Sequence, residues 1–385
     1  MDVLVTGGAG FIGSFVVDRL LAAGHAVRIL DSLDPQVHPA GRPGYLAGAA
    51  EFCHGDVRDR AAVERALDGI DAVVHAAAAV GVGQSLYKVE HYVDVNVRGT
   101  ATVLDCLQRH AGRLEKLLVF TSMTGYGEGV YRRPSDGKLL RVGIRSEEDI
   151  ARHGWEPACP DTGEPLEPAP TPEDSALLAR NVYALTKRWQ EELALALGGV
   201  YGFPVVCLRL FNVYGPRQSL SNPYTGVLAI FLSRLLAGEQ PVVYEDGGQS
   251  RDFISVHDVA DTALLALGTA AADGQVMNLG SGELRRIGDI GRTLASLTGR
   301  EDLQPRVTGQ FRTGDVRHCT ADITRARELL GFAPRVGWDQ GLRELLDWCR
   351  STTSADHFVR AQTELESRGL LSGRLGAPSH KESAG

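Results

Sequence analysis

The chain has 385 residues, of which 43% are hydrophobic and 23% are charged, and its formal net charge at pH 7 is −8. A chain of this length and composition has enough apolar residues for one large or two modest globular domains. The negative charge, without a dense block of Lys and Arg, argues against a nucleic-acid-binding or anionic-membrane surface.

The sequence also argues against a membrane protein and against a metal site. No window provides the ~18 uncharged apolar residues that a membrane-spanning helix needs, and the N-terminus lacks the basic leader of a signal peptide. The six cysteines are scattered, with no close pair and no metal-ligand spacing. We therefore expect a cytoplasmic protein with reduced thiols and no bound metal.

The first predicted element is a buried strand at residues 3–6, which runs through a glycine-rich turn into a predicted helix at 14–23. Gly8, Gly10 and Gly13 fit the dinucleotide-binding fingerprint, whose glycines allow a tight turn, close approach to a pyrophosphate and close packing of helix on sheet. The free N–H groups at the start of that helix then face the phosphates.

A second predicted strand, at residues 26–30, ends at Asp31, close to the ~20-residue offset of the carboxylate that binds the adenosine ribose. Such a carboxylate accepts a hydrogen bond from the 2′-hydroxyl and repels a 2′-phosphate. The sequence therefore favours NAD over NADP as cofactor. Capping of the following turn is the alternative role for Asp31.

Strand and helix patterns alternate through the first two hundred residues, which predicts a Rossmann-type, doubly wound parallel sheet with helices on both faces. The further strands are predicted at 51–54, 72–75, 116–121 and 205–210, and the helices at 60–67, 97–110 and 182–197. Later strands at 242–244 and 276–279 alternate with helices at 225–237, 256–267 and 287–297. These indicate a smaller mixed α/β substrate domain, interleaved with the first.

We expect this division to give a dinucleotide-binding domain at 1–212 and 252–280, and a substrate domain at 213–251 and 281–350. Seven of the 17 prolines lie between residues 132 and 172, and this density predicts that regular strand pairing is prevented. The insert at 131–175 is therefore expected to be a cover loop or poorly ordered. In the tail at 351–385, a helix at 356–368 is predicted to precede a disordered end.

Tyr183 and Lys187 are four residues apart on a predicted helix, and hence on one face. A nearby cation stabilises a phenolate and lowers the tyrosine pKa from ~10 toward the working pH, as acid–base catalysis requires. Lys187 is also placed to hold cofactor ribose hydroxyls. Such a pair also occurs by chance on surface helices.

Ser122 follows the predicted strand at 116–121, and in a doubly wound sheet the carboxyl ends of the strands face the ligand crevice. Its hydroxyl is then placed to donate a hydrogen bond to a substrate oxygen alongside Tyr183. The alternative is a serine that caps a turn.

Taken together, these motifs resemble those of the extended short-chain dehydrogenases/reductases, specifically the NAD-dependent nucleotide-sugar epimerase/dehydratase family. The resemblance covers roughly residues 1–350. It is carried by Thr6-Gly7-Gly8-Ala9-Gly10-Phe11-Ile12-Gly13, Gly55-Asp56-Val57, His75-Ala76-Ala77-Ala78, Asn96, Ser122, Tyr183 with Lys187, Arg209-Leu210-Phe211-Asn212-Val213-Tyr214-Gly215-Pro216-Arg217 and Arg251-Asp252-Phe253-Ile254.

The resemblance implies which residues bind NAD. Asp56 and Val57 match adenine contacts, and Asn96 matches a position that supports the active-site helix. The implied cofactor-binding set is Gly7, Gly10, Phe11, Ile12, Gly13, Asp31, Asp56, Val57, Ala76, Ala77, Ala78, Asn96, Tyr183 and Lys187.

It also implies a substrate-binding set: Gln84, Ser85, Thr124, Asn212, Arg251 and Arg312. Of these, Asn212 and the two arginines match positions that hold the diphosphate, a task that suits the forked guanidinium. Gln84 and Ser85 match hexose contacts. The alternatives are solvated salt bridges for the arginines and an ordinary polar loop for Gln84 and Ser85.

In this family a tyrosinate removes the proton of the sugar 4-hydroxyl while C4 passes a hydride to NAD⁺. Dehydratases carry Asp and Glu directly after the catalytic hydroxyl, where this chain has Met123 and Thr124, and the same change removes the glutamate of decarboxylating relatives. The remaining set, Ser122, Tyr183 and Lys187 with retained NAD, suffices for 4-epimerisation of a dTDP- or UDP-hexose. The alternatives are an NAD(P)H-dependent 4-ketoreductase, a 4,6-dehydratase and a non-catalytic redox-sensing dinucleotide-binding protein.

Residues 217–226 and 244–247 resemble a bacterial branch of sugar-nucleotide 4-epimerases that includes dTDP-L-rhamnose 4-epimerase-like proteins. Members of that branch carry Cys-x-x-Cys pairs in the insert, suited to a structural zinc, but this chain keeps only Cys159 of the four thiols. We therefore expect no metal here. The resemblance further implies a homodimer that packs the predicted helices at 97–110 and 182–197 against their copies.

Overall fold

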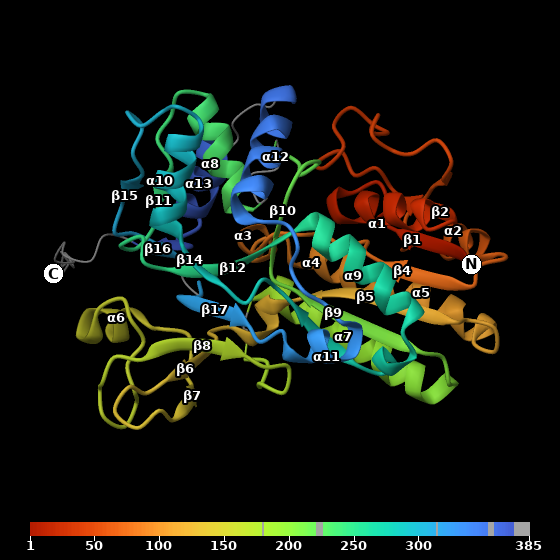
Figure 1. Ribbon diagram of the computed structural model, residues 1–385, viewed down its shortest axis with the longest axis horizontal. Helices are drawn as coiled ribbons and strands as arrows, with labels where there is room; N and C mark the ends of the chain where they lie inside the picture. The colour runs from red at the N-terminus through yellow and green to blue at the C-terminus, as the bar shows by residue number, and fades with distance from the viewer. Residues whose placement is uncertain (179–180, 221–225, 313–314, 353–357, 373–385) are drawn as a thin grey trace, which may run out of the picture.

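A computed structural model of the protein describes residues 1–178, 181–220, 226–312, 315–352 and 358–372 (Figure 1). The first residue of the helix predicted at 225–237 and the first two residues of that predicted at 356–368 lie outside this range. So does the segment 373–385, which was predicted to be disordered.

Seven parallel strands form the central sheet, which confirms the predicted doubly wound architecture. Their spatial order is β13-β9-β5-β4-β1-β2-β3. The strands are β1 (Asp2–Thr6), β2 (Ala26–Asp31), β3 (Glu51–His54), β4 (Ala72–His75), β5 (Lys116–Ser122), β9 (Val205–Leu210) and β13 (Val276–Leu279). The order reverses beside β1, where β2 and β4 flank it, so a crevice opens there at the carboxyl ends.

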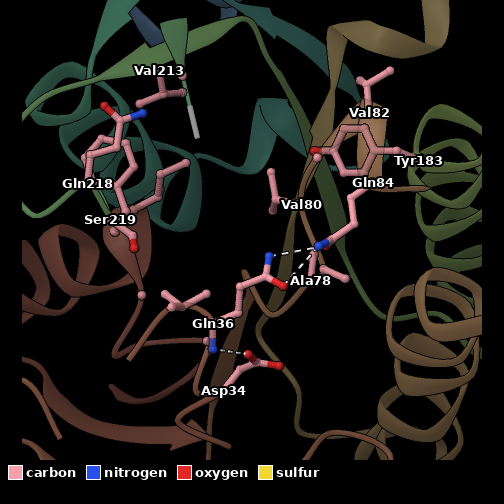
Figure 2. Close-up of a pocket in the computed structure, with 18 of the residues that line it drawn as sticks. Asp34, Gln36, Ala78, Val80, Val82, Gln84, Tyr183, Val213, Gln218 and Ser219 are labelled. Carbon is pink, nitrogen blue, oxygen red and sulfur yellow. Dashed lines mark hydrogen bonds between the residues drawn. The ribbon is translucent and has the colours of Figure 1, made fainter. Parts of the chain in front are cut away.

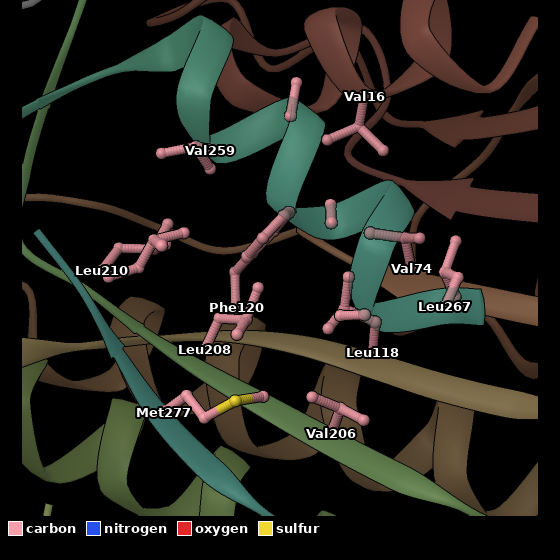
Figure 3. Packing of buried hydrophobic residues seen from close by; sticks show 14 of the residues in the cluster. Val16, Val74, Leu118, Phe120, Val206, Leu208, Leu210, Val259, Leu267 and Met277 are labelled. Carbon is pink, nitrogen blue, oxygen red and sulfur yellow. The ribbon is translucent and has the colours of Figure 1, made fainter. Parts of the chain in front are cut away.

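The two faces of this sheet bury alternate residues of each strand, because successive side chains point to opposite sides. On one face, Val3 and Val5 pack with α1 (Phe11–Ala22), α9 (Val256–Gly268) and α11 (Thr324–Leu330). Figure 3 shows α9 lying over Phe120, Leu208 and Met277 of three neighbouring strands. On the other face, Leu4 packs with α2 (Arg60–Leu67), α5 (Gly99–Leu107) and α7 (Val182–Tyr201).

The helix predicted at 97–110 is divided. A π-helical segment, η1 (Val93–Arg98), precedes α5, and a short 3₁₀ segment, η2 (Gln108–His110), follows it. Two short helices, α3 (Val82–Ser85) and α4 (Val89–Tyr92), precede η1. Two more 3₁₀ turns are η3 (Met123–Tyr126) and η4 (Ala270–Ala272).

A second sheet joins segments from the middle and the end of the chain, in the order β10-β12-β17-β8-β6-β7. Its strands are β10 (Asn212–Tyr214), β12 (Ser250–Ser255), β17 (His318–Ala321), β8 (Glu167–Thr171), β6 (Val130–Arg132) and β7 (Leu139–Arg141), with β14 (Leu284–Arg286) paired to β12. Beside it, α8 (Val227–Leu236), α10 (Ile287–Leu297) and α12 (Trp338–Ser351) share a separate apolar core (Figure 1). Two-residue strands form two further pairs: β11 (Val242–Val243) with β15 (Arg306–Val307), and β16 (Phe311–Arg312) with β18 (Leu371–Ser372).

The prediction that the proline-rich insert cannot pair regularly is wrong. It contributes β7, β8 and most of β6. β6 pairs antiparallel with both β7 and β8, and β8 also pairs in parallel with β17. Pro168 and Pro170 are two residues apart in β8, so both missing N–H groups lie on the same side of the strand. The residues between and beside them keep their N–H groups on the other side. The insert also contains α6 (Glu147–His153), which begins with a capping box between Ser146 and Asp149.

A buried ionic network holds the insert against the second sheet. The guanidinium of Arg317, whose residue is 1% exposed, donates to Glu245 and Asp246 at 2.7 Å and to Glu156 of the insert. Arg145 of the insert donates to Glu245 at 2.8 Å, and His318 lies 2.8 Å from Glu156. Removing one member of such a network leaves a buried charge without its partner. This lowers the stability of the fold more than replacing both partners by apolar residues does.

None of the helices among the described residues combines the length and the apolar character needed to cross a membrane. All six cysteines are unpaired.

We expect Glu156→Gln to lower the thermal midpoint by roughly 2 °C at pH 7. Burial raises the pKa of Glu156, but hydrogen bonds from His318 and Arg317 outweigh it and hold that pKa at about 2, below its ordinary 4.5. The carboxylate therefore stabilises the fold fully above pH 4.5, and this contribution is lost as the pH falls toward 2. The midpoints of wild type and variant, measured from pH 7 down to pH 3.5, should converge in acid.

The matched control is Glu148→Gln, which removes an exposed carboxylate from α6. Its midpoint should follow that of the wild type throughout. A gap between wild type and Glu156→Gln that stays constant from pH 7 to pH 3.5 would contradict this account.

Candidate active site

A cleft of about 1010 Å³ runs along the carboxyl ends of the central strands and continues between the two sheets. One end is lined by the glycine turn after β1 and by the segment after β4, and the middle by Ser122, Tyr183 and Lys187. The other end is lined by residues from β10, β12 and β16. Figure 2 shows Tyr183, Gln84 and Gln218 converging on this space from three separate segments.

The glycine turn has the close approaches that a dinucleotide site requires. Gly7 adopts φ +69°, and a Cβ added to it would lie 2.7 Å from the backbone nitrogen of Ala77. A Cβ on Gly13 would lie 2.2 Å from the carbonyl oxygen of Gly7, so α1 packs directly on the turn. Gly10 is the N-cap of α1 and brings no capping side chain, which leaves the first N–H groups of the helix toward the cleft.

The glycine assignment needs one correction. Of the four glycines in the turn, Gly7, Gly10 and Gly13 line the cleft, together with Phe11 and Ile12. Gly8 faces the sheet instead, where a Cβ would lie 2.9 Å from the side chain of Ile29. Its smallness therefore serves packing beneath the turn.

Asp31 lines the cleft at the end of β2 and also stabilises two turns. Its Oδ2 accepts a hydrogen bond from the N–H of Ala9 at 2.9 Å, and its Oδ1 accepts one from the N–H of Leu33 at 2.9 Å. The turn-capping role is therefore present. An ionised carboxylate has about four acceptor positions, so these two bonds leave capacity for a ribose hydroxyl.

Asp56, Val57 and the three alanines at 76–78 also line the dinucleotide end of the cleft. The carboxylate of Asp56 is held by the guanidinium of Arg58 at 2.9 and 2.7 Å. These residues therefore lie in the cleft with the glycine turn, and their contact with a cofactor stays a prediction.

Asn96 does not line the cleft, which corrects its inclusion among the residues that touch the cofactor. It is fully buried, and its amide exchanges hydrogen bonds with the backbone of Ala79 at 2.7 and 3.1 Å. The same amide donates to Thr186 of α7 at 2.9 Å. Asn96 thus ties the segment after β4 to α7, in agreement with the supporting role that the resemblance implied.

The three predicted catalytic residues come together in the middle of the cleft. Tyr183 and Lys187 lie one turn apart on α7, and the Tyr183 phenol is hydrogen-bonded to the Ser122 hydroxyl. The ammonium of Lys187 donates to the carbonyl of Phe120 in β5 at 3.0 Å. Ser122 also accepts from the N–H of Thr124 at 3.3 Å, so it both caps a turn and faces the phenol.

The expected lowering of the Tyr183 pKa by Lys187 is not found. Burial raises the pKa of Tyr183 to about 12, although the hydrogen bond to Ser122 acts in the opposite direction. Burial also lowers the pKa of Lys187 to about 7. Desolvation penalises whichever form of each group is charged, and the Lys187 ammonium bonds to a carbonyl rather than to the phenol.

Ser85 does not line the cleft, contrary to its predicted contact with a hexose. It is fully buried, donates to the carbonyl of Val82 at 2.7 Å and accepts from the backbone N–H of Tyr183 at 3.1 Å. It therefore positions the start of α7. Gln84 does line the cleft, and its amide is paired in both directions with that of Gln36, at 3.1 and 3.2 Å (Figure 2).

The predicted diphosphate residues line the far end of the cleft. Arg251 donates to Asp315 at 3.0 Å and to the carbonyl of Ser250 at 2.8 Å, so the salt-bridge alternative is present there. Arg312 stacks on the ring of Tyr244 with 4.5 Å between the guanidinium carbon and the ring centroid. Thr124 lines the middle of the cleft and donates to Ser122 at 3.0 Å.

Several buried polar atoms at this end have no hydrogen-bond partner among the residues that the structure describes. They belong to side chains that line the cleft: Asn212, Gln218, Tyr244, Gln249 and Arg312. A further such atom belongs to Arg217, which lies beside α1, where it pairs with Asp18 and stacks on Phe15. A buried polar group left unpaired costs about 1–3 kcal/mol, so this grouping indicates a polar ligand. Gln36, Gln218, Tyr244 and Gln249 were not predicted as site residues. Gln218 and Tyr244 lie in the segments 217–226 and 244–247, whose resemblance assigned them no role, and no motif or periodicity distinguishes Gln36 or Gln249.

Across the described ranges, no group of three or more His, Cys, Asp or Glu side chains is arranged to hold a metal ion.

The parallel sheet, the glycine turn and the Ser122–Tyr183–Lys187 arrangement define an extended short-chain dehydrogenase/reductase. Residues 3–145 and 160–280 match the model of the NAD dependent epimerase/dehydratase family, and the chain belongs to that family. Its class is that of the NAD-dependent sugar-nucleotide epimerases, which are isomerases, and its cofactor is NAD.

Three relatives illustrate the similarity. The chain is 37% identical to dTDP-L-rhamnose 4-epimerase of Burkholderia thailandensis, over 90% of this chain and 94% of the relative. The UDP-glucose 4-epimerase of Thermotoga maritima, solved with UDP-glucose, has a TM-score of 0.75 at 29% identity and covers 91% of this chain and 99% of its own. The UDP-glucose 4-epimerase of Thermus thermophilus, solved with NAD, has a TM-score of 0.69 at 30% identity, over 92% and 100% of the two chains.

We expect Gly13→Ala to reduce bound NAD at least tenfold, because a methyl group 2.2 Å from the Gly7 carbonyl must displace the turn that faces the pyrophosphate. NAD released from the purified protein on denaturation measures the occupancy. Gly199→Ala is the matched control, since a Cβ on this glycine of α7 meets no atom within 4 Å. Equal NAD contents in the two variants would show that the turn does not hold the dinucleotide.

Proposed function

We propose that the protein is a nucleotide-sugar 4-epimerase that acts on a dTDP- or UDP-hexose through a transient 4-keto sugar. The observation that carries this proposal is the meeting of Ser122, Tyr183 and Lys187 beside the dinucleotide end of one continuous cleft. The unpaired polar atoms at the other end of the cleft support a polar ligand of the nucleotide-sugar kind.

The chain's own residues account for the proton movements. Tyr183 takes the proton of the sugar 4-hydroxyl and later returns it to the same oxygen, while Ser122 donates a hydrogen bond that holds the oxygen in place. Lys187 supplies a cationic neighbour once its amine is protonated, which favours the phenolate. NAD, which the glycine turn and Asp31 would hold, would supply the acceptor and donor of the C4 hydride.

The residues after Ser122 favour epimerisation over elimination. Met123 is buried and has no acid or base function, and the Thr124 hydroxyl donates to Ser122. Neither position offers the carboxylate that loss of water from C5 and C6 needs. Asp31 disfavours NADPH, which weakens the 4-ketoreductase alternative, and the Tyr183–Lys187 pair weakens that of a purely redox-sensing protein.

The purified enzyme should invert C4 in at least one member of a panel of dTDP- and UDP-hexoses, with no NAD added and no net consumption of NADH. NMR of the anomeric and H4 signals follows the reaction. Tyr183→Phe should lower turnover at least about 100-fold while NAD remains bound, since it removes the general acid–base group. Tyr201→Phe, at the exposed end of the same helix, should leave turnover unchanged.

A reaction that consumes stoichiometric NADH with a 4-keto substrate would instead identify a ketoreductase. Near-normal turnover by Tyr183→Phe would disprove the assigned mechanism.

We further propose that the protein is a homodimer that pairs α7 and its neighbours with their copies. On α7, Leu185 and Trp189 are one turn apart and are 43% and 51% exposed. Val93 of η1, which packs against α7, is also exposed, as is Val89 of α4. Apolar side chains gathered on neighbouring helices support association through this face.

Leu185→Glu should therefore convert the dimer into monomers, because a charge would be buried in the interface. Light scattering after size exclusion gives the mass. Leu236→Glu is the matched control, since Leu236 ends α8 and is 42% exposed. A monomeric wild type, or dimers in both variants, would contradict this interface.

A further inference from the structure

The C-terminal part of the described chain returns to the cleft. After α12, the helix α13 (Phe358–Ser367) and the strand β18 lie at the substrate end, and Gln362, Leu365 and Leu370 line the cleft. Leu365 is 5% exposed although its neighbours in α13 are mostly exposed. This segment lies outside the residues that match the family model.

α13 ends in a hydrogen-bonded C-terminal turn that leads into β18. The N–H of Gly369 bonds to the carbonyl of Glu366 at 3.0 Å, and the N–H of Leu370 bonds to that of Leu365 at 3.0 Å. Gly369 has φ +67°, as this type of helix C-terminus requires. The second of these bonds joins Leu365 and Leu370, and the apolar side chains of both residues line the cleft.

On the substrate side, the segment supports the strand that carries Arg312. β18 pairs antiparallel with β16, and Leu371 lies directly opposite Arg312 in the register. Within the described part of the chain, the buried Nε of Arg312 has no hydrogen-bond partner, and its guanidinium stacks on Tyr244. Backbone pairing at this position fixes the main chain of Arg312, from which the guanidinium extends into the cleft.

The helix α13 also contacts the chain just after α3. The hydroxyl of Tyr87 donates to the carboxylate of Glu364 at 2.7 Å. The guanidinium carbon of Arg368 lies 4.4 Å from the centroid of the Tyr87 ring. α13 and β18 therefore connect α3, which carries Gln84, with β16, which carries Arg312.

We propose that residues 358–372 form a wall of the nucleotide-sugar site, in which Leu365 and Leu370 contact the ligand and β18 positions Arg312. This inference rests on the proposed function for the nature of the ligand. Among the described residues, the segment meets the rest of the chain through the β16–β18 pair, the Tyr87 contacts and the buried side chain of Leu365. A ligand that touches the wall stabilises docking, and by linkage docking tightens the ligand equally.

The test uses the full-length holoenzyme with Glu364→Ala, which removes the acceptor for Tyr87. Glu328→Ala is the matched control, an exposed glutamate on α11 outside the cleft. We expect KM for the hexose nucleotide, and Kd for dTDP or UDP alone by calorimetry, to rise about tenfold in Glu364→Ala only. The kcat and the NAD content should stay at wild-type values, because no group that touches the reacting atoms is changed.

Docking is measured separately by trypsin cleavage after Arg368, with the products identified by mass. Cleavage should be several-fold faster in Glu364→Ala than in the wild type or the control, and dTDP or UDP should slow it in the wild type. Unchanged cleavage would show that the segment is not docked as described and would overturn the inference. Faster cleavage with unchanged KM and Kd would overturn it too, since the segment would then lie outside the site.

The two proposals fail in different ways. If no hexose nucleotide is epimerised but Glu364→Ala weakens dTDP or UDP binding and speeds cleavage, the proposed function is wrong and the proposed role of residues 358–372 is supported. If epimerisation proceeds with normal KM in Glu364→Ala, the proposed function is supported and the proposed role of residues 358–372 is wrong. If the wild type binds neither nucleotide, both fall.

Discussion

The chemistry of this site depends on the burial of a phenol and an amine that lie one turn apart on α7. Tyr183 has its pKa raised to about 12 and Lys187 has its own lowered to about 7, in both cases mainly because burial disfavours the charged form. Charge brought in by the cofactor and substrate acts in a poorly screened environment, where it shifts proton equilibria far more than it would in water.

The surrounding structure serves to hold this pair in place. Asn96 and Ser85 each bond to α7 from buried positions, and the Phe120 carbonyl of β5 receives the ammonium of Lys187. At the other end of the cleft the arrangement is reversed, because several buried polar atoms there have no hydrogen-bond partner among the described residues. One end is thus preorganised by satisfied hydrogen bonds, while the other keeps its hydrogen-bonding capacity for a ligand.

The central sheet was predictable because each of its strands is a local apolar run followed by a helix or turn signal. The pairing of the insert was not predictable. β8 pairs with β17, about 150 residues later in the chain, and it can pair because Pro168 and Pro170 both lack their N–H on the same side of the strand. At the site, residues within motifs, such as Gly13 and Tyr183, were found. Gln36 was missed, since it reaches the cleft only through the path of a loop.

The sequence by itself determined the order of strands and helices, the glycine turn and the spacing of Tyr183 and Lys187, because these are short-range properties of the chain. Only the tertiary structure decided that Asn96 and Ser85 support the site without lining it, and that Asp31 also caps turns. It alone decided the pKa values, since desolvation depends on everything packed around a group. Contacts between distant segments, and the burial that they create, are not encoded in any local pattern.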